Sequence, residues 1–179
     1  MTQTARLYGS SLYDLAKEEG LIETVRKQLG EIRRLFGENP DYLRLLGEPS
    51  LAKGERLGMI EEAFGNQAER YLVSFLKLLC ERGLLGEFSG CCQVFTERYN
   101  KDHGITEAVA VSAVPLKKEQ ASALKERLEK LTGKKVHLTW RTDPRVLAGL
   151  RVEIDGKQFD GTVQGRLDGI SRKLNESIT

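Results

Sequence analysis

The side chains best suited to chemistry in this chain are cysteines and histidines. A thiol enzyme needs a histidine base beside its nucleophile, and the candidates are Cys80, Cys91, Cys92, His103 and His137. The two adjacent cysteines fall on the apolar stripe of a predicted helix, where cysteine usually acts as a small apolar filler. One histidine falls in a link between segments and the other on the outward face of a strand, so no nucleophile, base and orienting group can be assembled. The spacing of a zinc site is also missing. We therefore predict no catalytic residue and no metal site.

Phosphate-binding motifs are absent as well. The sequence contains neither G-x-x-x-x-G-K-[ST] nor G-x-G-x-x-G. The segment 160–165, Asp-Gly-Thr-Val-Gln-Gly, opens a predicted helix whose first amides could hold an anion. Asp160 would repel that anion, and Gly165 is better explained by close packing of the helix on a sheet. We predict no cofactor.

Composition and charge narrow the class of protein. The chain has 179 residues, with 28 basic and 26 acidic side chains and a net charge of +2, which argues against disorder and against a DNA-binding protein. The basic pairs Lys117-Lys118, Lys134-Lys135 and Arg172-Lys173 leave an RNA-binding module as an alternative, although no exposed aromatic set accompanies them. Three cysteines indicate no disulfide framework and a reducing setting. No apolar run approaches the ~20 residues of a membrane span, so we predict no direct membrane insertion.

Residues 1–104 follow the period of α-helices. Apolar residues recur three and four positions apart, in stretches that end at glycine or before proline. Helices are predicted from the N-terminus to near Gly20, over 22–36, over 42–46, from Pro49-Ser50 to Phe64, over 67–82, and over 88–99 with an end by Gly104. This pattern predicts a compact six-helix bundle.

From Ile105 the period changes to two, which indicates strands. A first strand with apolar residues on both faces is followed by a helix over 121–131, and a second strand points Val136, Leu138 and Trp140 inward. A third strand leads through an Asp155-Gly156 hairpin turn into a short strand ending near Phe159. Asp160 then caps a last helix that carries Val163, Leu167, Ile170 and Leu174. The fold class is α+β: a six-helix bundle over 1–104 and a small α/β domain of order β-α-β-β-β-α over 105–179.

The fifth predicted helix is the most informative element. Arg70, Ser74, Lys77 and Glu81 form one narrow polar stripe, and nearly every other position is apolar. Such a helix is normally buried on most sides, so it could be the central helix of the bundle. Alternatively, the flank with Tyr71, Phe75 and Leu78 could be an exposed groove for an amphipathic partner helix. The residues alone leave both readings open and indicate a non-catalytic interaction protein.

At this point the chain resembles a known family, the delta subunit of bacterial F-type ATP synthases, whose mitochondrial relative is the oligomycin-sensitivity-conferring protein. The resemblance covers essentially the whole chain. Near the N-terminus it includes 5–8 (Ala-Arg-Leu-Tyr) and 12–16 (Leu-Tyr-Asp-Leu-Ala), and it continues in 71–85. The most specific matches are C-terminal: 113–116, 131–136, Asp143-Pro144, Leu147-Ala-Gly149 and 160–167. Gly9 and Ser10-Ser11 depart from the small alanine and lysine residues that the family prefers, which predicts a locally weakened first helix.

The resemblance implies a non-catalytic stator subunit of the peripheral stalk. Its helical domain, 1–104, would bind the N-terminal helix of an alpha subunit of the catalytic head, and its second domain, 105–179, would bind the C-terminus of the stalk's b subunits. The positions that match the family's alpha-binding residues are Tyr8, Ser11 and Leu78, and we extend the site to Leu12 and Phe75.

The resemblance also implies where and with what the protein works. The protein would resist rotor torque during proton- or sodium-driven ATP synthesis, on the cytoplasmic face of the bacterial cell membrane, as a peripheral protein. One copy per complex, a monomer when free, and no nucleic-acid partner are expected. ATP chemistry would belong to other subunits.

Overall fold

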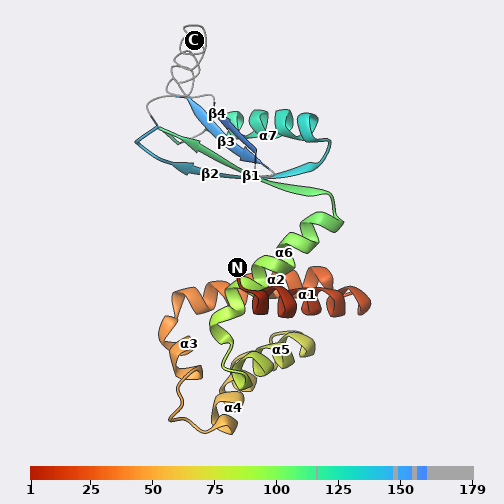
Figure 1. Cartoon of the computed structure of the whole chain (residues 1–179), viewed down its shortest axis with the longest axis vertical. Helices are drawn as coiled ribbons and strands as arrows, with labels where there is room; N and C mark the ends of the chain where they lie inside the picture. Colours follow the sequence, from red (N-terminus) through yellow and green to blue (C-terminus); the bar gives the residue numbers. More distant parts are fainter. Residues whose placement is uncertain (116, 147–148, 155–156, 161–179) are drawn as a thin grey trace, which may run out of the picture. The chain divides into compact units, whose positions relative to one another are not determined.

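The computed structural model describes residues 1–115, 117–146, 149–154 and 157–160, and these form a mixed α+β fold (Figure 1). The chain divides into two compact units, one from Met1 to Tyr99 and one that begins at Asn100. Helices make up the first unit, and a sheet with one described helix makes up the second.

Helices follow one another along the first unit, where apolar residues recur at helical spacing. Their bounds are α1 Gln3–Glu18, α2 Ile22–Glu38, α3 Pro40–Leu46, α4 Lys53–Phe64, α5 Arg70–Glu81 and α6 Phe88–Asp102, with a 3-10 turn at Leu85–Glu87. Gly20 and Gly83, which follow α1 and α5, have φ values of 68° and 67° that favour glycine. These two helices therefore end where the glycines in the sequence predict, whereas α2 runs through Gly37 to Glu38.

The start of α4 was predicted wrongly. The sequence suggests that Pro49-Ser50 opens this helix, but the helix begins at Lys53. The Glu48 carboxylate accepts hydrogen bonds from the amide and hydroxyl of Ser50, which holds this segment in a turn. The Glu55 carboxylate then accepts a hydrogen bond from the Ala52 amide at 3.1 Å, and this contact caps the helix at its actual start.

Aromatic side chains form much of the core of the helical unit. The ring of Tyr13 on α1 meets that of Phe95 on α6 edge to face, with centroids 5.2 Å apart. Phe36 on α2 contacts Phe64 and Phe88 in the same way, at 6.0 and 5.2 Å. Edge-to-face pairs add to the stabilisation that burial supplies, so these contacts tie α2, α4 and α6 to one another and α1 to α6.

The α1 and α6 helices approach each other with almost no side chain between their backbones. A Cβ atom at Gly9 would lie 2.7 Å from the Cys91 carbonyl oxygen and 2.8 Å from the Val94 Cβ, and one at Gly90 would lie 2.9 Å from the Ala5 Cβ. These distances are too short for any real Cβ. Gly9 thus allows close helix packing, and α1 continues unbroken through it.

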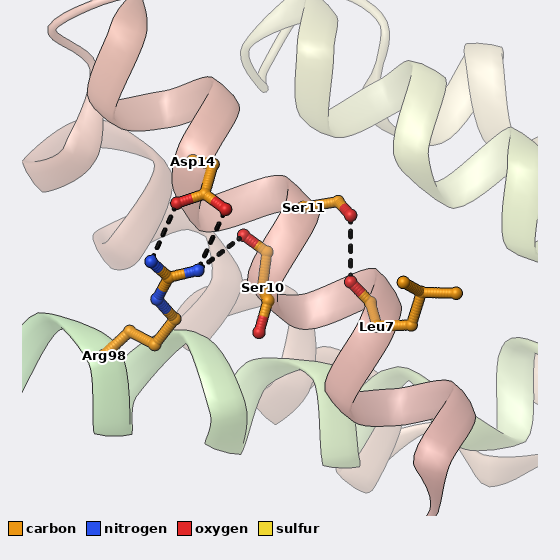
Figure 2. A network of polar contacts seen from close by, with 5 residues as sticks. All are labelled: Leu7, Ser10, Ser11, Asp14 and Arg98. Atoms are coloured by element: carbon orange, nitrogen blue, oxygen red, sulfur yellow. Dashed lines mark hydrogen bonds and ion pairs between the residues drawn. The ribbon is translucent and has the colours of Figure 1, made fainter.

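A polar contact locks α1 onto α6 beside this glycine. The Arg98 guanidinium pairs with the Asp14 carboxylate, with both N–O distances at 2.9 Å, and donates to the Ser10 carbonyl at 3.5 Å. It also lies over the Tyr13 ring, 5.0 Å from the centroid. Figure 2 shows that Leu7 and Ser11 point away from this cluster. One side of α1 is therefore fixed to α6, and another side is left for other contacts.

The second unit contains a four-stranded sheet in the order β2-β1-β3-β4. Its elements are β1 Ile105–Ser112, α7 Lys118–Thr132, β2 Lys135–Thr142, β3 Leu150–Ile154 and β4 Lys157–Asp160. β1 and β2 are parallel and are joined through α7, whereas β3 is antiparallel to both β1 and β4. A small apolar core, which includes Ala108, Ala110, Leu128, Val136, Val152 and Ile154, fills the space between the sheet and α7.

One residue of this sheet differs from its prediction. Trp140 was expected to point inward with Val136 and Leu138, yet 51% of it is exposed, whereas Val136 is buried. The alternation is correct, because Trp140 pairs with the buried Ala110 on the face that α7 covers. However, β2 is an edge strand, and the first buried residue of α7 is the small Ala121. The helix therefore leaves this indole partly uncovered.

Some predictions fall on residues outside the described part of the chain. These are the Asp155-Gly156 turn and the last helix, with Val163, Leu167, Ile170 and Leu174. The strands on either side of the turn are paired, with Ile154 opposite Lys157. Among the described helices, none has the length and apolar character needed to cross a bilayer.

The close approach at Gly9 leads to a testable prediction. We expect Gly9→Ala to lower the free energy of unfolding by about 1–3 kcal/mol, because the new Cβ would meet backbone atoms of α6. Gly58→Ala on α4 is the matched control, since nothing lies within 4 Å of its added Cβ. That control should stabilise the protein by up to about 1 kcal/mol through helix propensity. Urea unfolding measures both values, and equal effects would contradict the packing role of Gly9.

Candidate helix-binding groove

A groove runs along the helical unit between α1 and α5. Its volume is about 490 Å³, and it is lined by Leu7, Tyr8, Ser11, Leu12, Leu15, Tyr71, Ser74, Phe75 and Leu78. The structure therefore brings together every residue that was predicted for the binding site: Tyr8, Ser11, Leu12, Phe75 and Leu78. Three successive turns of each helix contribute to it.

The groove has a buried floor and an exposed apolar rim. Leu12 and Phe75 are 3% and 8% exposed, and they form the floor. Leu7, Tyr71 and Leu78 are 65%, 36% and 38% exposed, although an apolar side chain loses free energy by staying in water. A continuous apolar surface of this kind, on an otherwise charged helical unit, is typical of a site that binds another protein.

The structure resolves the two readings of the fifth helix. The face of α5 with Leu72, Leu76 and Leu79 is completely buried, as in a central helix. The flank with Tyr71 and Leu78 is open, as in the groove hypothesis. α5 therefore contributes one face to the core and a neighbouring open apolar flank to the groove.

Four further lining residues were not among the predicted site residues: Leu7 and Leu15 on α1, and Tyr71 and Ser74 on α5. Tyr71 was, however, placed on the flank that the groove hypothesis uses. Ser74 was counted in the polar stripe of α5. The residues most easily missed are Leu7 and Ser74, because neither continues the apolar stripe of its own helix. Only the spacing from Tyr8 and Phe75 could have indicated them.

Tyr71, in the first turn of α5, interacts with Glu19, which follows the last residue of α1. Interaction of its hydroxyl with the Glu19 carboxylate, together with the negative charge of that carboxylate, raises the pKa of Tyr71 above its ordinary value. The beginning of α5 therefore lies near the end of α1, at the wall that the tyrosine ring lines.

The cysteines do not form a reactive site. Cys80, Cys91 and Cys92 are all buried and reduced. Burial raises the pKa of the Cys91 thiol to about 11 and that of Cys92 to about 12, so neither forms the thiolate needed for nucleophilic attack at neutral pH. The Cys80 thiol lies 3.5 Å from the Leu46 carbonyl oxygen. These residues are apolar fillers of the helical core.

Residues with metal-binding or nucleic-acid-binding potential are also dispersed. Within 1–115, 117–146, 149–154 and 157–160, no group of histidine, cysteine and carboxylate residues could hold a metal ion. Of the predicted basic pairs, Lys117-Lys118 and Lys134-Lys135 are exposed at opposite ends of α7, and Arg172-Lys173 lies outside the described part of the chain. The described part of the chain thus combines a helical unit that carries an open apolar groove with a small unit built on a four-stranded sheet.

Comparison with known proteins places this chain in a family. Residues 4–174 match the family described as "ATP synthase delta (OSCP) subunit". The ATP synthase subunit delta of Gloeobacter violaceus is 32% identical, over 99% of this chain and 95% of that protein. The ATP synthase subunit delta 2 of Syntrophotalea carbinolica is also 32% identical, over 97% and 98%. A chain in the cryo-EM structure of the Toxoplasma gondii mitochondrial ATP synthase shares the fold, with a TM-score of 0.74 and 20% identity over 97% of this chain and 98% of that one.

The chain belongs to the ATP synthase delta (OSCP) subunit family, as its resemblance to that family predicts. It is therefore a non-catalytic, structural subunit of the ATP synthase and a peripheral part of this membrane-bound complex. Its role in ATP synthesis and ion transport is that of a peripheral-stalk component. Membership of this family favours the role of a peripheral-stalk subunit over that of an RNA-binding module.

The buried thiols predict how stability depends on pH. Between pH 9 and 11 the unfolded chain, with a thiol pKa of 9.0, releases protons that Cys91 and Cys92 retain in the folded state. The free energy of unfolding should therefore fall as the pH rises above 9, by at most about 1.4 kcal/mol per pH unit for each thiol. Urea unfolding at a series of pH values measures this slope. Cys92→Ala should destabilise the protein at every pH but make the slope shallower, and an unchanged slope would contradict the assignment.

Proposed function

We propose that this subunit is a stator link, which holds the catalytic head of the ATP synthase to the membrane-anchored peripheral stalk. Rotor torque acts on the head during ATP synthesis, and a static connection must resist it. The helical unit would bind the head and the second unit would bind the b subunits. The single observation that carries this proposal is the open apolar groove between α1 and α5 in a member of this family.

The ligand of the groove is proposed to be the N-terminal helix of one alpha subunit. An amphipathic helix inserts its apolar face into such a groove through residues that are three and four positions apart. The groove offers matching apolar contacts along successive turns, with Leu12 and Phe75 beneath and Tyr8 and Leu78 at the sides. The site residues are thus Tyr8, Ser11, Leu12, Phe75 and Leu78.

The domain assignment completes the proposal. Residues 1–104 would be the domain that binds the head, and residues 105–179 would be the domain that holds the C-terminus of the b subunits. Support comes from the difference between the two units, since the groove lies wholly within the helices of the first. The protein would act as one copy per complex, on the cytoplasmic face of a bacterial membrane, in a proton- or sodium-translocating enzyme.

Substitution of one groove residue tests the docking site. We expect Leu78→Asp to weaken binding of a peptide with the first 20 or so residues of the same organism's alpha subunit by at least about 30-fold, because a buried, unpaired charge costs several kcal/mol. Leu45→Asp on α3 is the matched control, since Leu45 is 40% exposed, Leu78 is 38% exposed and Leu45 lies outside the groove. Calorimetric titration should show one-to-one binding with a negative heat-capacity change for wild type and for the control. Equal affinities of both variants would rule out this site.

The stator role itself predicts a separation of two activities. In membranes that contain the assembled enzyme, Leu78→Asp should leave ATP hydrolysis largely intact, because the chemistry belongs to other subunits. ATP-driven ion pumping should fall, since the head would turn with the rotor when its static link fails. Fluorescence quenching in inverted vesicles measures pumping beside a phosphate-release assay. Intact pumping in vesicles whose subunit no longer binds the alpha peptide would refute the stator role.

A further inference from the structure

The β2 strand, Lys135–Thr142, lies at one edge of the four-stranded sheet (Figure 1). An edge strand presents a row of backbone N–H and C=O groups that have no partner within the sheet. An extended segment of another chain can pair with such a row, and main-chain hydrogen bonds then supply affinity. β2 has eight residues, whereas β4 at the other edge has four. The longer edge is therefore the better candidate for a docking site.

Hydrogen bonds at both ends of β2 show which of its backbone groups face outward. The Lys135 amide donates to the Gly104 carbonyl at 3.1 Å, and the amide of Asp143, directly after the strand, donates to the Ser112 carbonyl at 3.0 Å. Backbone groups of successive residues in a strand point to opposite sides, so the odd-numbered residues of β2 bond to β1. The even-numbered residues point their N–H and C=O groups away from the sheet: Val136, Leu138, Trp140 and Thr142.

One end of this outer row is closed and the rest is open. The Val136 amide donates to the Glu129 carboxylate of α7 at 3.0 Å, which agrees with the outward direction of the even-numbered amides. The backbone groups that Leu138, Trp140 and Thr142 point outward have no hydrogen bond to any described part of the chain. Trp140 and Thr142 are exposed, and Leu138 is half-buried. The open edge of β2 is therefore the stretch 138–142.

The two faces of the open edge differ in chemistry. On the face that α7 covers, 51% of the Trp140 side of the strand is exposed as an apolar indole. On the opposite face, Lys135 and Arg141 are exposed, and neither has an ion pair with a residue that the structure describes. Side chains of an added strand would alternate between these faces. Apolar residues would match the indole, and acidic residues would match the two cations.

We propose that the open edge of β2 binds an extended segment of the b subunits as an additional strand. The segment would alternate apolar residues, which cover Trp140, with acidic residues, which pair with Arg141. A helix could not serve in the same way, because its own backbone groups are already paired with one another. This inference rests on the proposed function and adds the conformation and the chemistry of the b segment that the second unit holds.

Amide hydrogen exchange, followed by NMR, tests this assignment on the full-length subunit. The probe is the cytoplasmic part of the same organism's b subunits. In the free protein the Trp140 and Thr142 amides should exchange rapidly, whereas those of Thr139 and Arg141, which point to β1, should be protected. Saturating b subunits should slow exchange of Trp140 and Thr142 by at least about 10-fold, because main-chain pairing protects amides. The Val136 amide, already bonded to Glu129, should change little.

Two substitutions at one position isolate the backbone contribution. Trp140→Ala and Trp140→Pro both remove the indole, but only proline also removes the outward amide hydrogen. An edge strand tolerates proline where the N–H faces away from the sheet. Trp140→Pro should bind the b subunits about 3- to 10-fold more weakly than Trp140→Ala, which is the usual effect of one lost hydrogen bond. Calorimetry gives both affinities, and circular dichroism checks that both variants are folded.

A charge reversal tests the acidic character of the segment without altering the backbone. Arg141→Glu should weaken binding by about 3- to 10-fold, because an attraction is replaced by a repulsion. The matched control is Arg33→Glu on α2, an exposed arginine of the helical unit that also has no ion pair with a described residue. The control should bind as wild type does. Equal affinities of the two variants would contradict the acidic match.

The remaining outcomes separate this inference from the proposed function. If the b subunits bind while the Trp140 and Thr142 amides still exchange rapidly, the second unit is the stalk-binding domain and the added strand is wrong. If those amides are protected without b subunits, another part of this chain covers the edge, or a second copy does when protection rises with concentration, and the inference is wrong. If wild type does not bind the b subunits, the stalk-binding function is wrong, and this inference fails with it.

Discussion

The close contact between α1 and α6 is the constraint on which the groove depends. A Cβ at Gly9 would lie 2.7 Å from the Cys91 carbonyl oxygen, so only glycine lets the two backbones meet there. Arg98 then holds α1 in place through Asp14 and the Ser10 carbonyl. With one side of α1 committed to α6, its neighbouring side faces α5 across an open space. The shape of the groove therefore follows from an interaction on the other side of the same helix.

The groove also depends on α5, which packs one face into the buried core and leaves a neighbouring flank open to the groove. Its completely buried residues, Leu72, Leu76 and Leu79, anchor it in the core and prevent it from moving to cover its own exposed flank. An apolar groove that cannot collapse remains available to a partner, and the partner does not have to open it. Such preorganisation favours tight binding, because less ordering entropy is lost on association.

Sequence patterns predicted most of this architecture, and the exceptions have physical reasons. Periodicity reports which residues share a face, so it located the helices and the apolar flank of α5, but it does not report what covers a face. For this reason periodicity left open whether α5 is buried on all sides. It also could not predict that Trp140, correctly placed on its face, is half exposed. Gly9 was interpreted as a weak point of its helix, because helix propensity is a local property, whereas close helix packing depends on Cys91, which is far away in sequence. Ser74 was missed for a similar reason, since its position in the groove depends on the facing helix.

A stator link also needs a defined register, and an apolar groove alone does not provide one. Apolar contacts are non-directional, and a helix with a regular apolar stripe could shift by one turn and bury nearly the same area. Polar residues at a single position of an apolar interface commonly fix register, because every shifted arrangement leaves them unpaired. Ser11 and Ser74 are polar exceptions in the lining that Tyr8, Phe75 and Leu78 make largely apolar. Under the proposed function, the apolar residues would supply the affinity, whereas a defined register would need directional contacts of the kind that polar groups make.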